Sequence, residues 1–398
     1  MANALAPFPA HFQDRPATMI DYLRIHVLWA DGSVESQRIA EMISTHFDGL
    51  GMERDGVAYR IPVRFSSAPW AAGSTLPKPV DLTRAAHNAV VVLNDDFMFE
   101  QAAAWNDYLA ETRAAITARG EVDIYIPFGS PGREAVPASD AARNTQYVRR
   151  DRWTQLTTPA ARDKRLLLHV LVQIRRYLRT LKVDQRDEPL FVSHAKADGD
   201  TTARAIITYV QSPDNDVPLE TFYDAMELNP GEDFQARFKE EIGRGTLIAI
   251  VSDVYDSRPW CVFELTTAKR HRRPIVLADI NSVRISRTFP YGANLPRVRL
   301  SPAPGDDAWI DPLLAEAMSE GLRCDIFEAQ ARKALAGADA LVLPRPPELF
   351  DIVDGDPPPN TILYPDPPLG DIEAELVQRA VAAIAPSARL LTLSEYSA

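Results

Sequence analysis

The chain has 398 residues, of which 46% are hydrophobic and 25% are charged. This length exceeds that of one ordinary compact core and predicts two or three domains. Acidic residues outnumber basic ones, 55 to 43, which gives a formal net charge of −12. This excess of negative charge argues against a protein that coats nucleic acid non-specifically, so no direct nucleic-acid contact is expected.

The two cysteines, Cys261 and Cys324, are too few for a disulfide framework. Neither lies in a CxxC or Cys/His spacing that would bind zinc, so no metal site is expected. Residues 1–19 form a proline-marked leader without the basic start and apolar run of a signal peptide. No later stretch approaches the roughly 18 uninterrupted apolar residues of a membrane span. We therefore expect a cytoplasmic protein that does not enter a membrane.

Residues 20–182 are expected to form a first α/β domain. An apolar run at 22–30 predicts a strand, and Ser33 is placed to cap the helix that follows it. The amphipathic segment 162–182 predicts a closing helix with a basic face. That face could bind phosphate or membrane, but a solvated face is the more common role. Three further strand-like runs lie between these segments, at 59–65, 88–94 and 122–128.

The same alternation of strands and helices restarts at 187–335 and predicts a second α/β domain with a parallel sheet. The remaining residues, 336–398, predict a small αβ segment that alone is too small for a robust core and should dock on the rest. Within the second domain the expected strands are 189–194, 217–223, 246–252, 274–280 and 296–300, and the expected helices are 199–211, 232–244, 258–271 and about 309–335.

Three motifs of the second domain, in order, resemble the Toll/interleukin-1 receptor (TIR) domain of bacterial type. "FVSHAKAD" at 191–198 resembles its first box, "FYDAMELNPGEDF" at 222–234 its BB loop, and "IVSDVYDSRPWCVFEL" at 250–265 the helix that bears its glutamate. The resemblance implies a flavodoxin-like α/β fold with a parallel sheet for 187–335. Domain 20–182, which repeats the same order of elements, is then expected to be a degenerate TIR-like domain. The alternative for it is an unrelated α/β domain whose Trp105 matches by chance.

The resemblance also implies an activity, because related bacterial and plant domains cleave NAD+ between nicotinamide and ribose. NAD+ would be the substrate, and no cofactor is implied. The family's catalytic glutamate follows the tryptophan of a WCxxE-like motif, which here places Glu264 after Trp260. Positions i and i+4 share one helix face, so both side chains can line one cleft. A carboxylate suits this reaction, since it can stabilise the oxocarbenium character that develops on the ribose.

The remaining binding residues transfer from the same resemblance. Trp260 is as consistent with packing as with ligand contact, whereas for His194 a satisfied strand-end histidine is favoured over a general base. Cys261 is expected to be a small buried hydrophobe. The residues expected to contact NAD+ are Phe191, Ser193, His194 and Lys196 in the first box, and Ser252, Tyr255, Ser257 and Trp260 before and within the glutamate helix.

Two functions stay open at this point. The first is an NAD+ hydrolase or cyclase of an antiviral, antiphage-type immune system. The resemblance implies that it is activated by self-association through the BB loop, Tyr223 to Asp233. An immune-system partner protein or signal would be the trigger. The second is a non-catalytic TIR adaptor that docks other TIR domains. In domain 20–182, aligning Trp105 with Trp260 puts Leu109 at the position of Glu264. That domain is therefore expected to sense or assemble rather than to catalyse.

Overall fold

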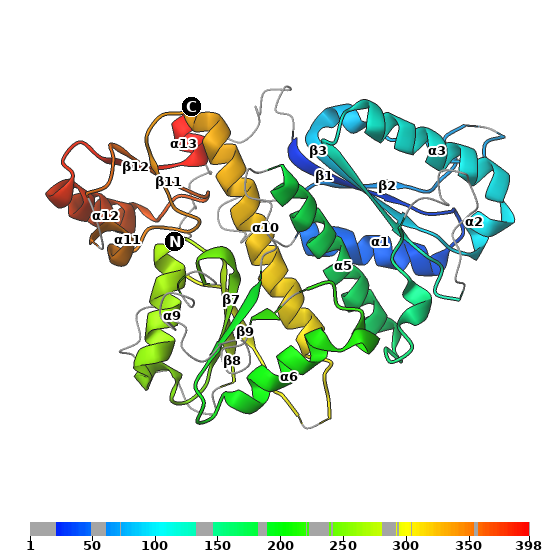
Figure 1. Cartoon of the computed structure of the whole chain (residues 1–398). Coiled ribbons are helices and arrows are strands. Elements are labelled where there is room, and N and C mark those ends of the chain that lie inside the picture. Colours follow the sequence, from blue (N-terminus) through cyan, green and yellow to red (C-terminus); the bar gives the residue numbers. More distant parts are fainter. Residues whose placement is uncertain are drawn as a thin grey trace, which may run out of the picture.

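The computed structural model describes residues 21–48, 61–71, 73–132, 146–181, 189–219, 221–222, 239, 242–280, 292, 294–303, 305–353 and 357–397. In this part of the chain the strands form three sheets, and every strand pairing within them is parallel. Helices cover the sheets and separate the two larger ones (Figure 1). The expected α/β class with parallel sheets is confirmed.

The first sheet is ordered β2-β1-β3-β4. One of its two inner strands, β3, carries the run "AVVVL". These five residues are all buried, as expected for a parallel strand covered on both faces. The strands are β1 (Asp21–Leu28), β2 (Val63–Ser66), β3 (Ala85–Leu93) and β4 (Asp123–Phe128), and the helices are α1 (Val34–Asp48), α2 (Asp96–Glu100), α3 (Ala102–Ala118) and α5 (Pro159–Thr180).

The second sheet is ordered β6-β5-β7-β8-β9. Alternate residues of its strands enter different cores: Ile248 and Ile250 pack in the core that contains α10, whereas Leu247 and Ala249 pack in the core that contains α9. The sheet is thus covered on both faces. Its strands are β5 (Leu190–His194), β6 (Thr221–Phe222), β7 (Thr246–Val251), β8 (Ile275–Asp279) and β9 (Arg297–Arg299), with helices α6 (Asp200–Gln211), α9 (Pro259–Arg270) and α10 (Ile310–Leu335).

The two large sheets repeat one strand order. Numbered within each half, both run 2-1-3-4, which is the order of flavodoxin-like sheets. The second sheet adds β9 beside β8, and in the first half a single parallel bridge from Val148 to Phe128 stands at the same place beside β4. In both halves a long helix follows, α5 in the first and α10 in the second. This correspondence supports a duplicated unit.

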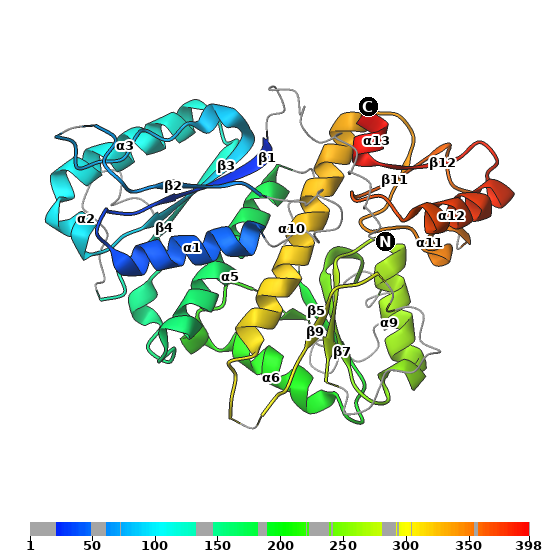
Figure 2. The same ribbon diagram turned by 180° about the vertical axis from the view of Figure 1, so that it is seen from behind.

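Helices α5 and α10 lie side by side between the two large sheets, and one hydrophobic core runs through both halves (Figures 1 and 2). The expectation that the basic face of α5 is solvated is wrong at two positions. Arg165 and Arg175 are buried, and each forms an ion pair with an acidic residue of α10, Asp311 and Asp325, with both N–O distances 3.1 Å. The charges of this face therefore join the two halves.

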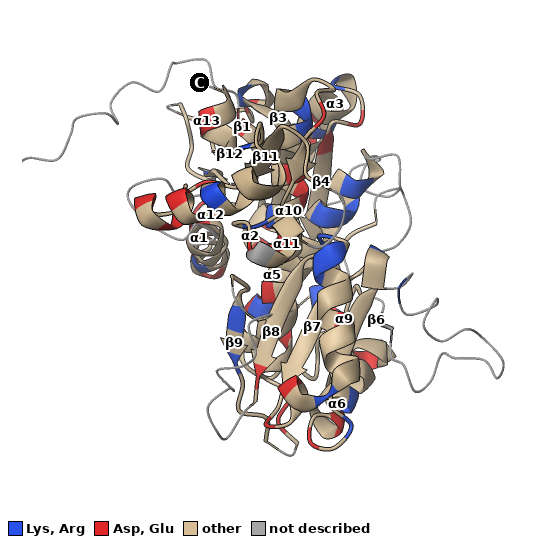
Figure 3. Cartoon of the chain, turned by 90° about the vertical axis from the view of Figure 1, so that its left-hand side faces the viewer, with Lys and Arg blue, Asp and Glu red and all other residues tan. Residues whose placement is uncertain are grey.

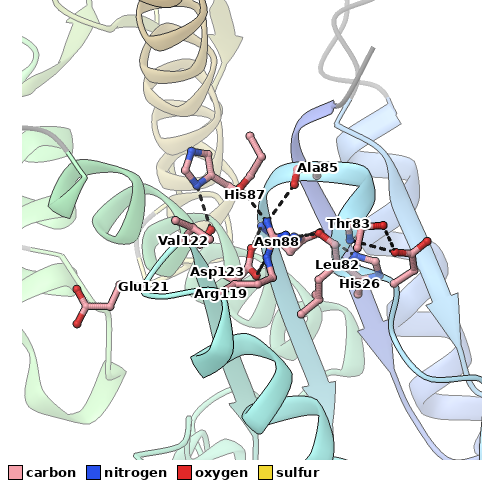
Figure 4. Close-up of polar contacts among 12 residues, drawn as sticks. His26, Leu82, Thr83, Ala85, His87, Asn88, Arg119, Glu121, Val122 and Asp123 are labelled. Atoms are coloured by element: carbon pink, nitrogen blue, oxygen red, sulfur yellow. Dashed lines mark hydrogen bonds and ion pairs between the residues drawn. The ribbon is translucent and has the colours of Figure 1, made fainter. Parts of the chain in front are cut away.

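A buried polar network fastens the amino-terminal end of the first sheet (Figure 4). The Asp123 carboxylate accepts hydrogen bonds from the backbone and side-chain amides of Asn88, at 2.7 and 2.8 Å, and from Arg119 Nε at 2.5 Å. The Asn88 side-chain oxygen lies 3.1 Å from His26 Nε2. The buried polar groups of this network have hydrogen-bond partners, so the network stabilises the sheet.

The C-terminal residues form a small unit with a third sheet, ordered β10-β11-β12. Its side toward α10 is apolar, because Leu363 and Leu391 pack against Phe327 and Leu335 of that helix. In Figure 3, acidic residues are visible on α12 of this unit, and basic residues are visible on β9 of the second sheet. The elements of this unit are β10 (Leu341–Val342), α11 (Leu349–Val353), β11 (Thr361–Tyr364), α12 (Asp371–Ile384), β12 (Arg389–Thr392) and α13 (Leu393–Ser397).

Candidate functional site

Glu264 lies within α9, the helix that follows β7 in the chain. The sequence begins this helix with Pro259, whose missing N–H costs nothing in the first turn. Glu264 is only 4% exposed, and Ser193 Oγ donates a hydrogen bond of 2.5 Å to Glu264 Oε2. Ser193 belongs to β5, which is the neighbour of β7 in the sheet. A buried carboxylate is thus held at the carboxyl-terminal side of two central strands.

Tyr255 completes what we call the Glu264 cluster, formed by Ser193, Tyr255 and Glu264. Tyr255 is the first residue of the short helix η4 (Tyr255–Ser257), and its side chain is fully buried. Its hydroxyl lies 2.7 Å from Ser193 Oγ. Burial, together with the nearby Cys261 and Glu264, raises the pKa of the Tyr255 hydroxyl well above its usual value. This phenol is therefore neutral at physiological pH. The hydroxyl of Ser193 joins a phenol and a carboxylate that lie in a water-poor environment.

Cys261 lies within the core on the same side of the sheet and is 2% exposed. Burial, and then the charge of Glu264, raises the pKa of its thiol to about 12. The thiolate is the reactive form of a cysteine, so this side chain is a poor nucleophile. The placement agrees with the expected small buried hydrophobe.

Trp260 is half-buried, and its ring stacks on that of Phe263 with the centroids 4.9 Å apart and the planes inclined by 18°. The Lys239 ammonium lies 6.0 Å from the centroid of the Phe263 ring. Trp260 therefore packs within its own helix while keeping part of its ring accessible. The two roles expected for it are both compatible with this geometry.

The other first-box residues lie in different surroundings. Phe191 is 2% exposed and packs in the core beneath α9. The His194 side chain is only 4% exposed, and its Nε2 lies 3.5 Å from an Asp200 oxygen. Lys196 is exposed. Of the four first-box residues, only Ser193 makes a described hydrogen bond to Glu264, while Phe191 supports the helix from below.

The loops after β5 and β7 are joined through Asp198, which the sequence motifs did not single out. Its carboxylate accepts hydrogen bonds from Ser252 Oγ at 2.5 Å and from the Val254 backbone at 3.2 Å. Ser257 is exposed and donates to the Val254 carbonyl at 2.7 Å. Ser252 and Ser257 thus shape the loop that leads into α9. Asp198 ends the "FVSHAKAD" motif, but a carboxylate in a loop carries no sign of its partner.

The BB loop, Tyr223 to Asp233, lies outside the described residues. Within the described part of the chain, no group of His, Cys, Asp and Glu side chains is arranged to hold a metal ion, and none of the helices there is both long and apolar enough to span a membrane. A surface hollow of about 420 Å³ contains none of the expected site residues; it is lined by Thr201, Arg204, Ala205, Thr208, Tyr209, Ser212, Asn215 and Asp307.

The first half has no counterpart of the Glu264 cluster in its own helix α3. Trp105 is fully buried and Leu109, one turn later, is 7% exposed in the same core. Glu111 is exposed to solvent. The position that the repeat aligns with Glu264 thus holds an apolar side chain. Comparison of the whole sequence with family models and with curated proteins found no match.

Proposed function

We propose that residues 187–335 form a TIR domain of bacterial type and that the protein is an NAD+ glycohydrolase with Glu264 as its catalytic residue. The observation that supports this proposal most strongly is the buried carboxylate of Glu264, hydrogen-bonded to Ser193 beside two central strands. The strand order of the second sheet, 2-1-3-4-5 within this unit, is in keeping with a flavodoxin-like fold. In such sheets ligands bind beyond the carboxyl ends of the strands.

In the proposed reaction the bond between the ribose C1′ and the nicotinamide nitrogen breaks, and its electron pair leaves with nicotinamide. Positive charge then develops on the ribose, and the Glu264 carboxylate stabilises it. A ribose hydroxyl would donate a second hydrogen bond to the Glu264 carboxylate, whose orientation the Ser193 hydroxyl maintains. Burial strengthens this interaction, because few water molecules screen the carboxylate. Water, or a nucleophile within the substrate, then attacks C1′ and gives a hydrolysed or cyclic product.

A TIR adaptor is the second candidate function. It is favoured by the same burial, since a carboxylate that is 4% exposed and bonded to Ser193 can serve simply to fasten α9 to β5. An adaptor would need the fold and its docking surfaces but not the charge of Glu264. The two functions therefore differ in what removal of that charge does.

Incubation of the purified full chain with NAD+ tests the proposal. The protein should be concentrated or crowded to promote association, and free nicotinamide should be followed over time. Time-dependent release that requires Glu264 supports the hydrolase. If no nicotinamide is released under any of these conditions while the protein binds other TIR domains, the adaptor is the correct reading.

A further inference from the structure

The C-terminal unit contacts α9 through a buried ion pair. The Lys269 side chain is completely buried, and its ammonium donates to both oxygens of Glu348, at 2.8 and 2.6 Å. Lys269 is five positions after Glu264 in the same helix, which places it about 7.5 Å further along the axis. The helix that carries the candidate catalytic residue is therefore held at its far end by residues from outside the second α/β unit.

Further charges and one aromatic ring surround this pair. The side chains of Arg345 and Asp351 are buried, and Nη2 of Arg345 lies 3.8 Å from Oδ1 of Asp351. The Glu348 backbone N–H donates to the Asp351 carboxylate at 3.0 Å. Arg270 lies over the ring of Phe350, 5.4 Å from its centroid. Burial lowers the pKa of Lys269 and raises that of Glu348, and the ion pair opposes both shifts. Each partner thus needs the other in order to stay charged in this environment.

The same unit also packs against α10, the helix that covers the opposite face of the second sheet. Leu363 is fully buried against Phe327 and Leu335 near the end of that helix. Helices α9 and α10 cover opposite faces of the sheet, as the two separate cores show. Figures 1 and 2 show the C-terminal unit beside the ends of both helices. It therefore connects the two layers that enclose the sheet.

We infer that the C-terminal unit is a strap that fixes the position of α9 along the sheet and so orients Glu264 toward Ser193. Lys269 is the positioning residue, because its ammonium has to reach Glu348 whenever α9 is seated. A helix that packs on a sheet through small and apolar side chains can slide or rotate slightly, and a single buried ion pair at its end limits this movement. The part of this inference that concerns activity rests on the proposed hydrolase function.

Amide hydrogen exchange of the full chain tests the strap without reference to activity. Lys269→Met should raise exchange in α9 by about tenfold or more, since one partner of a buried pair is lost. Exchange in α6 and in β1 to β4 should change much less. The matched control is Lys333→Met, which removes an exposed lysine near the end of α10. Unchanged exchange in α9, or an equal rise throughout the chain, would overturn the strap.

Nicotinamide release then tests the positioning role. Lys269→Met should lower kcat about tenfold while KM changes less than twofold, because the substrate site remains but Glu264 is less often oriented. An unchanged kcat alongside faster exchange in α9 would refute positioning. If the wild-type chain releases no nicotinamide, the hydrolase proposal fails while the exchange result still decides the strap. Should Lys269→Met fail to fold, Glu348→Gln provides the same comparison, since it keeps the side-chain volume.

Discussion

The hydroxyl of Ser193 is the central contact at the scale of single residues, because it joins Tyr255 and Glu264. Ser193→Ala should lower the rate of nicotinamide release more than Tyr255→Phe does. The first change removes the donor that orients the carboxylate, whereas the second leaves that donor in place. Each should also reduce the free energy of unfolding by about 1–3 kcal/mol, as expected when a buried polar group loses its partner. Steady-state kinetics and urea unfolding of both variants measure these effects, and equal losses of rate would contradict the orienting role.

Cys261 should resist alkylation in the native protein. A thiol whose pKa is about 12 contains roughly one thiolate in 10,000 molecules at pH 8, and Cys324 is buried as well. Iodoacetamide at pH 8 should therefore label neither cysteine until denaturant unfolds the chain. Mass spectrometry after timed quenching measures the labelling. Complete modification of the folded protein within minutes would show that the thiol is accessible and ionised.

At the scale of elements, Gly321 shows how closely α5 and α10 approach each other. A Cβ atom at this position would lie 2.1 Å from Cζ of Arg175. Arg175 cannot easily move aside, because it is buried and bonded to Asp325 of α10 and to Thr246 of β7. The glycine in the middle of a long helix is thus explained by the guanidinium that crosses it.

Gly321→Ala should destabilise the protein, although alanine normally favours a helix interior by about 1 kcal/mol relative to glycine. Overpacking against Arg175 should outweigh that gain and cost about 1–3 kcal/mol of unfolding free energy. Thermal or urea unfolding checks the sign. The double variant Gly321→Ala with Arg175→Met, which removes the clashing group, should lose less than the sum of the two single variants. A Gly321→Ala protein more stable than the wild type would refute the close contact.

Much of the element pattern follows from the sequence, since the buried runs of β3 and β7 and the helical spacing of α9 and α10 are local properties. What periodicity does not reveal is the partner of a charged side chain. Arg165 and Asp311 are 146 positions apart, so the basic face of α5 gave no sign of its buried contacts. Likewise, the motif singles out Glu264, but the clustering with Ser193, 71 positions away, depends on β5 and β7 being neighbours. The same holds for Asp198, whose contacts appear only once the loops meet.

At the scale of the whole molecule, two histidines lie where the halves meet, His46 half-buried and His169 buried. His46 of α1 lies 2.9 Å from the Ser319 hydroxyl of α10, and burial lowers its pKa from 6.5 to about 4. His169 of α5 lies 3.1 Å from the Asp216 carbonyl of the second half, and burial, aided by Arg165, lowers its pKa to about 3. Both side chains are therefore neutral in the folded protein.

These shifts predict a loss of stability in acid. The unfolded chain protonates each histidine below pH 6.5, whereas the folded chain does not. The contribution of the two neutral histidines to the free energy of unfolding is therefore fully present above pH 6.5. It falls as the pH decreases toward 4, by up to about 1.4 kcal/mol per pH unit for each histidine. Unfolding midpoints in urea between pH 7 and pH 4.5 measure this slope. His46→Gln should make the slope shallower, and a slope that is the same in the variant would contradict the assignment to His46.

In the proposed hydrolase, the charge of Glu264 drives cleavage of NAD+. The most direct measurement is the rate of nicotinamide release by concentrated wild-type protein beside that of Glu264→Gln, which keeps the volume of the side chain. Circular dichroism and unfolding curves should first show that the variant is folded. We expect the wild type to release nicotinamide and the variant to be about two to three orders of magnitude slower. A folded variant that retains more than half of the wild-type rate would remove Glu264 from the mechanism.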